Sequence, residues 1–150
     1  MKVTGNKGAS PQRRGDSICG LKNFARNILC KGQRNMNYNL VLHVDSDNPG
    51  TLALAFTNAA NYRAALPGET FKMVLVANGP AVKLFTRGEE ALASQGADIA
   101  AQGLEIRLCN NALTKFGIDP AQIWDCATVV PAGVAELVRL QNEGYSYIKP

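Results

Sequence analysis

Short apolar runs alternate with helix-like stretches along residues 39–150 of this 150-residue chain. The apolar runs have the length and the β-forming residues of strands, and Gly or Pro stands at many of the boundaries between segments. Strands that alternate with helices form βαβ units, which predicts an α/β fold: a mainly parallel five-stranded sheet covered on both faces, a three-layer α/β/α sandwich. The predicted strands are 39–45, 70–77, 104–109, 127–130 and an edge strand at 145–149; the predicted helical segments are 51–66, 81–85, 89–102 with a break at Gly96, 110–116, 120–125 and 133–142.

Charge is distributed unevenly along the chain. The net charge is +4, but residues 1–36 carry eight basic residues against Asp16 alone, a net +7, which leaves −3 for the rest. The composition of residues 1–17 predicts disorder, and residues 18–30 have the spacing of a short basic amphipathic helix. This extension could contact nucleic acid or an anionic membrane, or target an organelle. We favour a poorly ordered extension on a domain at residues 37–150, and expect no nucleic-acid binding by the domain.

The cysteines give no metal-binding pattern. Cys19, Cys30, Cys109 and Cys126 form no CxxC pair, and the single histidine, His43, is distant from them in sequence. We therefore expect no metal, and the absence of GxGxxG and GxxxxGK[ST] motifs gives no reason to expect a nucleotide cofactor. No apolar run approaches the length of a membrane span, and no secretory signal is present. These features predict a cytoplasmic protein with reduced thiols.

Polar residues follow three of the predicted strands. In open parallel sheets, ligands bind beyond the carboxyl ends of the strands, so these residues are expected to line one pocket. They are His43 and Asp45 at the end of the first strand, Asn78 and Gly79 after the second, and Cys109, Asn110 and Asn111 at the end of the third.

Cys109 is the candidate catalytic residue, because it ends a predicted strand and opens a predicted helix. Free backbone N–H groups and the helix dipole would stabilise a thiolate there, and a thiolate can take up sulfur as a persulfide. A second interpretation, about equally supported by position alone, is a buried thiol that packs as a small apolar residue. For Cys126, simple packing is favoured over chemistry.

His43 and the nearby aspartates also have alternative roles. His43 lies within an apolar strand, so burial is favoured over general-base catalysis. Asp45 and Asp47 precede a predicted helix, and capping of that helix is favoured over a carboxylate pair. No serine lies in a G-x-S-x-G context, so hydrolase chemistry has no support.

Four segments resemble the DsrE/DsrF-like family of sulfur-relay proteins. They are LVLHVDSDNPGTLALAFTNAANY, with Asn58 and Asn61, FKMVLVANGPAVKLF, GLEIRLCNNALTKFGI and, most specifically, VVPAGVAELVRLQNEGYSYIKP. Together they cover nearly all of residues 38–150, and they are most similar to a stand-alone branch described as intracellular sulfur oxidation proteins. The resemblance implies a flavodoxin- or Rossmann-like parallel sandwich that forms homo-oligomers, from dimers to trimers or hexamers.

Two hypotheses of function follow. The resemblance implies a sulfurtransferase-like sulfur carrier, in which Cys109 accepts sulfur from a donor protein and passes it to an acceptor thiol. The backbone amides of Asn110 and Asn111 would then hold the thiolate, with their side chains as helpers. Asn78 and His43 would line the pocket, and Cys109 would be accessible to solvent. The alternative is a module that binds a small anionic ligand or a protein partner in the same pocket, without turnover.

Overall fold

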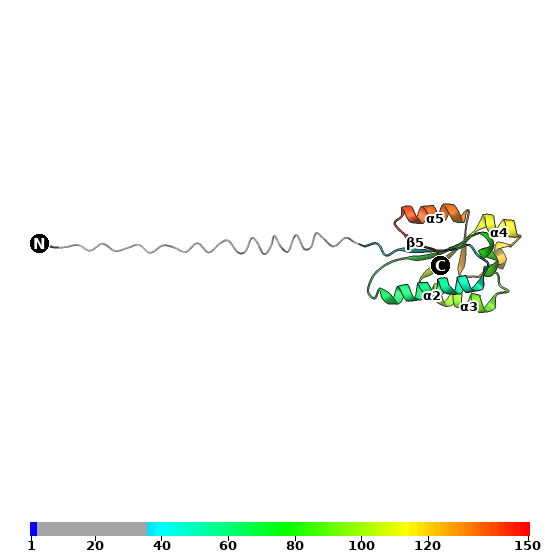
Figure 1. The fold of residues 1–150 in the computed structure, drawn as a ribbon, viewed down its shortest axis with the longest axis horizontal. Coiled ribbons are helices and arrows are strands. Elements are labelled where there is room, and N and C mark those ends of the chain that lie inside the picture. Colours follow the sequence, from blue (N-terminus) through cyan, green and yellow to red (C-terminus); the bar gives the residue numbers. More distant parts are fainter. Residues whose placement is uncertain (3–35) are drawn as a thin grey trace. The chain divides into compact units, whose positions relative to one another are not determined.

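A five-stranded sheet organises residues 37–150 (Figure 1). The computed structural model describes residues 1–2 and 36–150, and the helix predicted for residues 18–30 lies outside this described part. The strands are β1 (Leu40–Val44), β2 (Met73–Ala77), β3 (Leu104–Cys109), β4 (Ala127–Val130) and β5 (Ser146–Ile148). They lie in the order β4-β3-β2-β1-β5, and each pairing between neighbours is parallel. The predicted α/β fold with a parallel five-stranded sheet is therefore confirmed.

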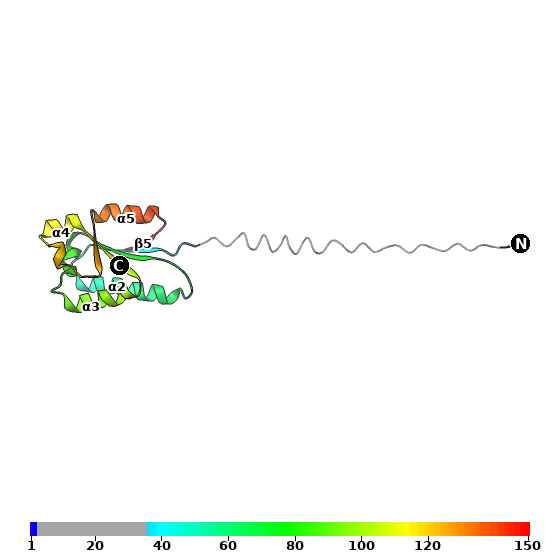
Figure 2. The ribbon, with the colours of Figure 1, turned by 180° about the vertical axis from the view of Figure 1, so that it is seen from behind.

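Helices cover the two faces of this sheet unequally (Figures 1 and 2). α2 (Pro49–Ala65) and α3 (Glu90–Ala101) lie on one face, and α5 (Gly133–Asn142) lies on the other. The short helix α4 (Asn110–Phe116) directly follows β3, and 3₁₀ turns occupy Gly79–Phe85 (η1) and Pro120–Gln122 (η2). The sequence located all of these segments, with boundaries that differ by a few residues.

Alternation of side chains along the central strands gives each face its own apolar core. The larger core lies on the α2 and α3 face and includes Leu42 of β1 and Phe56 of α2. The smaller core, beneath α5, consists of Val41, Val74, Val76, Leu137, Leu140 and Tyr145. Because a single ten-residue helix covers the α5 face, polar side chains of the same strands can stay near solvent there.

The predicted break of a helix at Gly96 is wrong. α3 runs continuously through Gly96, which is buried against the indole ring of Trp124. A Cβ atom at this position would lie 2.5 Å from Cζ3 of that ring, so the missing side chain provides room for Trp124. A glycine in a helix can serve close packing instead of ending the helix.

The predicted capping of α2 by an aspartate is also wrong. Asn48 is the capping residue, and its side-chain oxygen accepts a hydrogen bond from the backbone N–H of Gly50 at 2.8 Å. Asp47 instead pairs with Lys83 at 3.1 Å, and Asp45 pairs with Lys149. Both lysines are far away in sequence, so the folded chain supplies partners that local sequence does not show.

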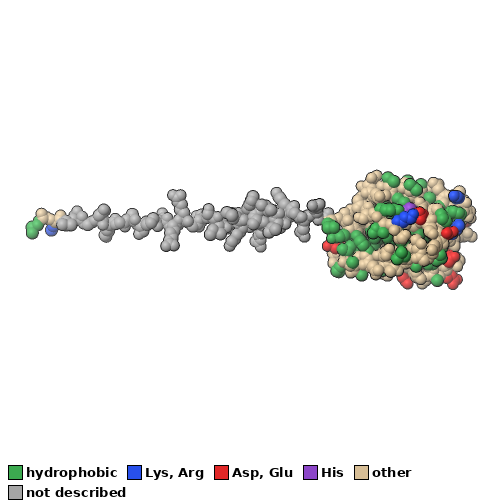
Figure 3. Space-filling view, in the orientation of Figure 1, with side chains coloured by type: hydrophobic (Ala, Val, Ile, Leu, Met, Phe, Trp, Pro, Cys, Tyr) green, Lys and Arg blue, Asp and Glu red, His purple; other side chains and the backbone are tan. Residues whose placement is uncertain are grey.

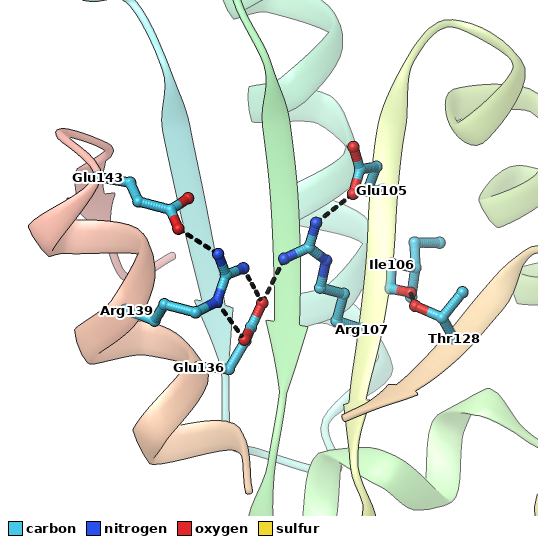
Figure 4. A network of polar contacts seen from close by, with 7 residues as sticks. All are labelled: Glu105, Ile106, Arg107, Thr128, Glu136, Arg139 and Glu143. Atoms are coloured by element: carbon cyan, nitrogen blue, oxygen red, sulfur yellow. Dashed lines mark hydrogen bonds and ion pairs between the residues drawn. The ribbon is translucent and has the colours of Figure 1, made fainter. Parts of the chain in front are cut away.

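A chain of ion pairs fastens α5 to the sheet (Figure 4). Glu136 of α5 accepts hydrogen bonds from Arg107 of β3 and, at 2.7 and 3.0 Å, from Arg139 on its own helix. Arg107 also pairs with Glu105, and Arg139 with Glu143. The side chain of Glu136 is only 11% exposed, so its charge depends on these two guanidinium groups.

Neutralising Glu136 should weaken the fold and change its response to acid. Hydrogen bonds from Arg139, and then from Arg107, lower the pKa of Glu136 from 4.5 to about 2. A lowered pKa means that the carboxylate stabilises the fold above about pH 4.5 and loses this effect as the pH falls towards 2. We expect Glu136→Gln to lower the free energy of unfolding by about 1–3 kcal/mol at neutral pH, measured by urea denaturation.

Urea denaturation repeated at several pH values should show a smaller loss of stability between pH 4.5 and pH 2 for Glu136→Gln than for the wild type. Glu143→Gln is the matched control, because Glu143 is half exposed and contacts Arg139 alone among the residues of Figure 4. It should change stability by less than about 1 kcal/mol. If the free energy of unfolding fell equally with pH in the wild type and Glu136→Gln, the lowered pKa of Glu136 would be contradicted.

Candidate functional site

The candidate site forms where Cys109 and Asn78 meet beneath the first residue of α5. A Cβ atom placed on Gly133 would lie 2.9 Å from the Cβ of Asn78 and 3.1 Å from the Cβ of Cys109. The two existing Cβ atoms are therefore no more than 6.0 Å apart. Gly133 is buried, and its missing side chain is what lets the backbone of α5 approach both residues. The sequence correctly placed Cys109 at the junction between β3 and α4.

Hydrogen bonds extend the site from Asn78 across the next two strands. His43 of β1 lies with its Nε2 atom 3.0 Å from Oδ1 of Asn78. Its other ring nitrogen, Nδ1, lies 2.6 Å from the hydroxyl oxygen of Tyr147 on β5. His43 is buried, as the sequence indicated, but both of its nitrogens have polar partners. The structure thus brings together three of the predicted residues, Cys109, Asn78 and His43, and adds Tyr147. We call these four side chains the polar row.

The thiol of Cys109 is less accessible than we expected. Cys109 is 7% exposed and contributes to the larger apolar core, so the prediction of an accessible thiol is wrong for this structure. Tyr147, at the opposite end of the row, is 41% exposed. Solvent therefore has far less access to Cys109 than to Tyr147.

Three further predicted residues surround the site without joining the row. Asn110 and Asn111 are exposed on the first turn of α4. Asp45 is held by Lys149, and the hydrogen bond from this ammonium group lowers the pKa of the carboxyl. A fourth, Gly79, adopts a left-handed φ of 53°, which is unfavourable for other residues, so it serves the turn into η1.

The amino end of α5 adds electrostatic character that the sequence analysis missed. The first N–H groups of a helix have no partner within the helix, and they carry a partial positive charge. Ala132, the capping residue of α5, has no side-chain oxygen to offer them. Because Gly133 contacts the Cβ atoms of Cys109 and Asn78, this end of the helix lies directly over the site.

Two surface hollows lie elsewhere on the described part of the chain. The first has a volume of about 460 Å³ and is lined by Arg87, Glu90, Ala93, Ala97, Trp124, Asp125 and Cys126. Burial raises the pKa of the Cys126 thiol, which disfavours the reactive thiolate and agrees with a packing role. The second, of about 350 Å³, lies between the end of α2 and the start of β2.

Within the described residues, no three His, Cys, Asp or Glu side chains lie close enough together to hold a metal ion. None of the described helices combines the length and the apolar character needed to cross a bilayer.

The fold and the site define an open parallel α/β protein with a cysteine at the carboxyl end of a central strand. The chain belongs to the DsrE/DsrF-like family, whose model matches residues 39–150. A similar solved structure is that of MTH1491 from Methanobacterium thermoautotrophicum, a protein of unknown function. The two are 31% identical with a TM-score of 0.70, and the match covers 76% of this chain and all of the other. No curated protein matches the chain.

Adding one methyl group at Gly133 should disturb the site. In an ordinary helix, Gly→Ala stabilises by about 0.5–1 kcal/mol, but here the new Cβ would collide with Asn78 and Cys109. We therefore expect Gly133→Ala to lower the free energy of unfolding by about 1–3 kcal/mol, measured by urea denaturation. Gly88→Ala is the control, because nothing lies within 4 Å of a Cβ there. A stabilised Gly133→Ala variant would show that the helix does not lie so close.

Proposed function

We propose that this member of a sulfur-relay-type family carries sulfur as a persulfide on Cys109. The observation that carries the proposal is the position of Cys109, between the end of β3 and the amino end of α5. Fixed N–H dipoles at this place favour the thiolate and the negatively charged persulfide. A free thiol of this kind persists in a reducing compartment, which is consistent with the cytoplasmic location that we expect.

The transfer consists of two sulfur exchanges without net oxidation. In the first, the thiolate of Cys109 attacks the terminal sulfur of a donor persulfide. A new S–S bond forms, the S–S bond of the donor breaks, and its electron pair leaves with the donor thiolate. In the second exchange, an acceptor thiolate attacks the terminal sulfur now held by Cys109. The S–S bond at Cys109 breaks, and its thiolate is regenerated.

Mass spectrometry after exposure to a persulfide donor tests this proposal. The wild type should gain the mass of one sulfur atom, mapped to Cys109, and Cys109→Ser should gain none at that position. Cys126→Ser is the matched control and should behave like the wild type, because burial disfavours the Cys126 thiolate. Equal sulfur uptake by the wild type and Cys109→Ser would refute the carrier.

The burial of Cys109 supports a second candidate, a binding module on the same fold. A thiol that is 7% exposed can serve as a packing group while the surrounding dipoles hold a small anion or a partner. The two candidates differ in their dependence on sulfur: the module binds its ligand equally well in the wild type and Cys109→Ser, whereas the carrier loses transfer altogether.

We further propose that the chain forms a homo-oligomer through α5. Val134 and Val138, one turn apart on this helix, are 65% and 54% exposed, and apolar side chains reach the surface of this domain in several groups (Figure 3). Exposed apolar residues that recur on one helix face indicate a protein interface more than scattered ones do.

Replacing Val138 by Lys should shift the oligomer towards the monomer, measured by size-exclusion chromatography with light scattering. A buried ammonium group would oppose association through its desolvation cost. Leu54→Lys on α2 is the matched control, since Leu54 is 49% exposed on another helix, and it should leave the mass unchanged. A wild-type protein that is monomeric at high concentration would contradict the proposal.

A further inference from the structure

Four side chains on neighbouring strands form the polar row, and Cys109, at the end of the row next to Gly133 of α5, also packs against the larger apolar core. Cys109 ends β3, Asn78 directly follows β2, His43 belongs to β1 and Tyr147 to β5. These strands are consecutive neighbours in the sheet, so the row follows the strand order from a buried thiol to a half-exposed phenol. His43 and Tyr147 lie far apart in the chain, and the parallel pairing of β1 with β5 brings them together.

The hydrogen-bond partners of His43 define the direction of the row. Oδ1 of Asn78 can only accept, so the Nε2 atom of His43, 3.0 Å away, must carry the proton. In a neutral imidazole the other nitrogen, Nδ1, is then an acceptor, and the hydroxyl of Tyr147 donates to it at 2.6 Å. Each group thus has one role: Tyr147 donates to His43, and His43 donates to Asn78.

Because the oxygen of Asn78 faces His43, its NH₂ group faces the opposite way along the row. An amide has its oxygen and its NH₂ group on opposite sides of Cγ, and the oxygen is occupied by His43. Since β2 lies between β1 and β3, the side away from His43 is the side of Cys109. The Cβ atoms of Asn78 and Cys109 are at most 6.0 Å apart, a separation that an N–H···S hydrogen bond between the two side chains can span.

We infer that Asn78 donates a hydrogen bond to the anionic sulfur of Cys109, and that His43 and Tyr147 are positioning residues that fix the orientation of its amide. The inference rests on the proposed function, because it assigns to the same site the group that stabilises the thiolate and the persulfide. The phenol of Tyr147 thereby acts on the sulfur of Cys109 through two intervening residues, His43 and Asn78, without touching it.

Nitrogen NMR of the histidine ring tests the direction of the row. The chain contains one histidine, so a protein labelled with ¹⁵N-histidine gives a single pair of ring signals. At about pH 8, where an imidazole is ordinarily neutral, we expect a fixed tautomer with the proton on Nε2. A proton on Nδ1, or exchange between two tautomers, would overturn the inference because the oxygen of Asn78 would no longer be held.

Carbon NMR of the cysteines tests the effect on sulfur. With ¹³Cβ-labelled cysteine in the full chain, the Cys109 signal reports the thiolate fraction at each pH, even for a buried thiol. We expect Asn78→Ala, and likewise Asn78→Leu, which keeps a similar size and no charge but loses the donor, to move the midpoint to higher pH by about half a unit or more.

Substitution of either positioning residue should raise the Cys109 midpoint as well, but by less than substitution of Asn78. Tyr147→Phe and His43→Leu should each move the Cys109 midpoint upwards, whereas His43→Gln, which keeps an N–H donor for Asn78, should restore part of the wild-type value. Tyr62→Phe is the matched control: it also removes a hydrogen-bonded hydroxyl, 2.9 Å from the carbonyl oxygen of Tyr38, but on α2.

The outcomes separate this inference from the proposed function, because neither NMR measurement needs a sulfur donor. An unchanged midpoint in both Asn78 variants would overturn the hydrogen bond to sulfur, even if Cys109 accepted sulfur. A shift in the Asn78 variants alone, with Tyr147→Phe and His43→Leu equal to the wild type, would overturn the positioning roles. Shifts in all three positions, without sulfur uptake by Cys109, would support the row and refute only the carrier.

Discussion

The close contact of α5 with the sheet is the constraint on which the site depends. α5 packs on the smaller apolar core, and two further contacts one turn apart hold it against the sheet. At Gly133 the helix backbone lies directly over Cys109 and Asn78, since no side chain separates them. At Glu136 a carboxylate pairs with Arg107 of β3. The first contact sets the distance between the helix and the site, and the second opposes sliding or rotation of the helix.

The unequal covering of the sheet explains why the polar residues lie on the α5 face. The face beneath α2 and α3 contains the larger apolar core, and a polar side chain there would have to be satisfied far from solvent. Beneath α5 the apolar core is small, so His43 and Arg107 can occupy strand positions on either side of it. Each is satisfied by a partner from another element: Tyr147 from β5 for His43, and Glu136 from α5 for Arg107.

The sequence predicted the fold well because the buried strands of a parallel sheet are nearly continuous apolar runs. It also brought Cys109, Asn78 and His43 to one edge through the rule that ligands bind at the carboxyl ends of strands. It missed Tyr147, because no local signal shows that β5 pairs with β1 at the far edge of the sheet. The importance of Gly133 was hidden for the same reason, since a close approach between distant segments is not visible in a glycine itself.

The errors in the sequence analysis share a physical cause. Asp47 has the right chemistry for a helix cap, but Lys83, distant in sequence, binds it, and Asn48 caps the helix instead. Gly96 has the wrong propensity for a helix, but Trp124 needs its space. Local preferences amount to about 1 kcal/mol, and a tertiary contact of similar or greater strength overrides them.

Burial of Cys109 connects the electrostatics of the site with the way in which sulfur would move. Dipoles stabilise a charged sulfur more strongly where water is excluded, so burial makes the N–H groups of α5 and the amide of Asn78 more effective. If Cys109 carries a persulfide as proposed, the same burial protects it from small thiols of the solvent, which would otherwise reduce it. On the proposed function, sulfur therefore passes to a partner whose docking opens the site, and the reaction is selective because access, more than intrinsic reactivity, limits it.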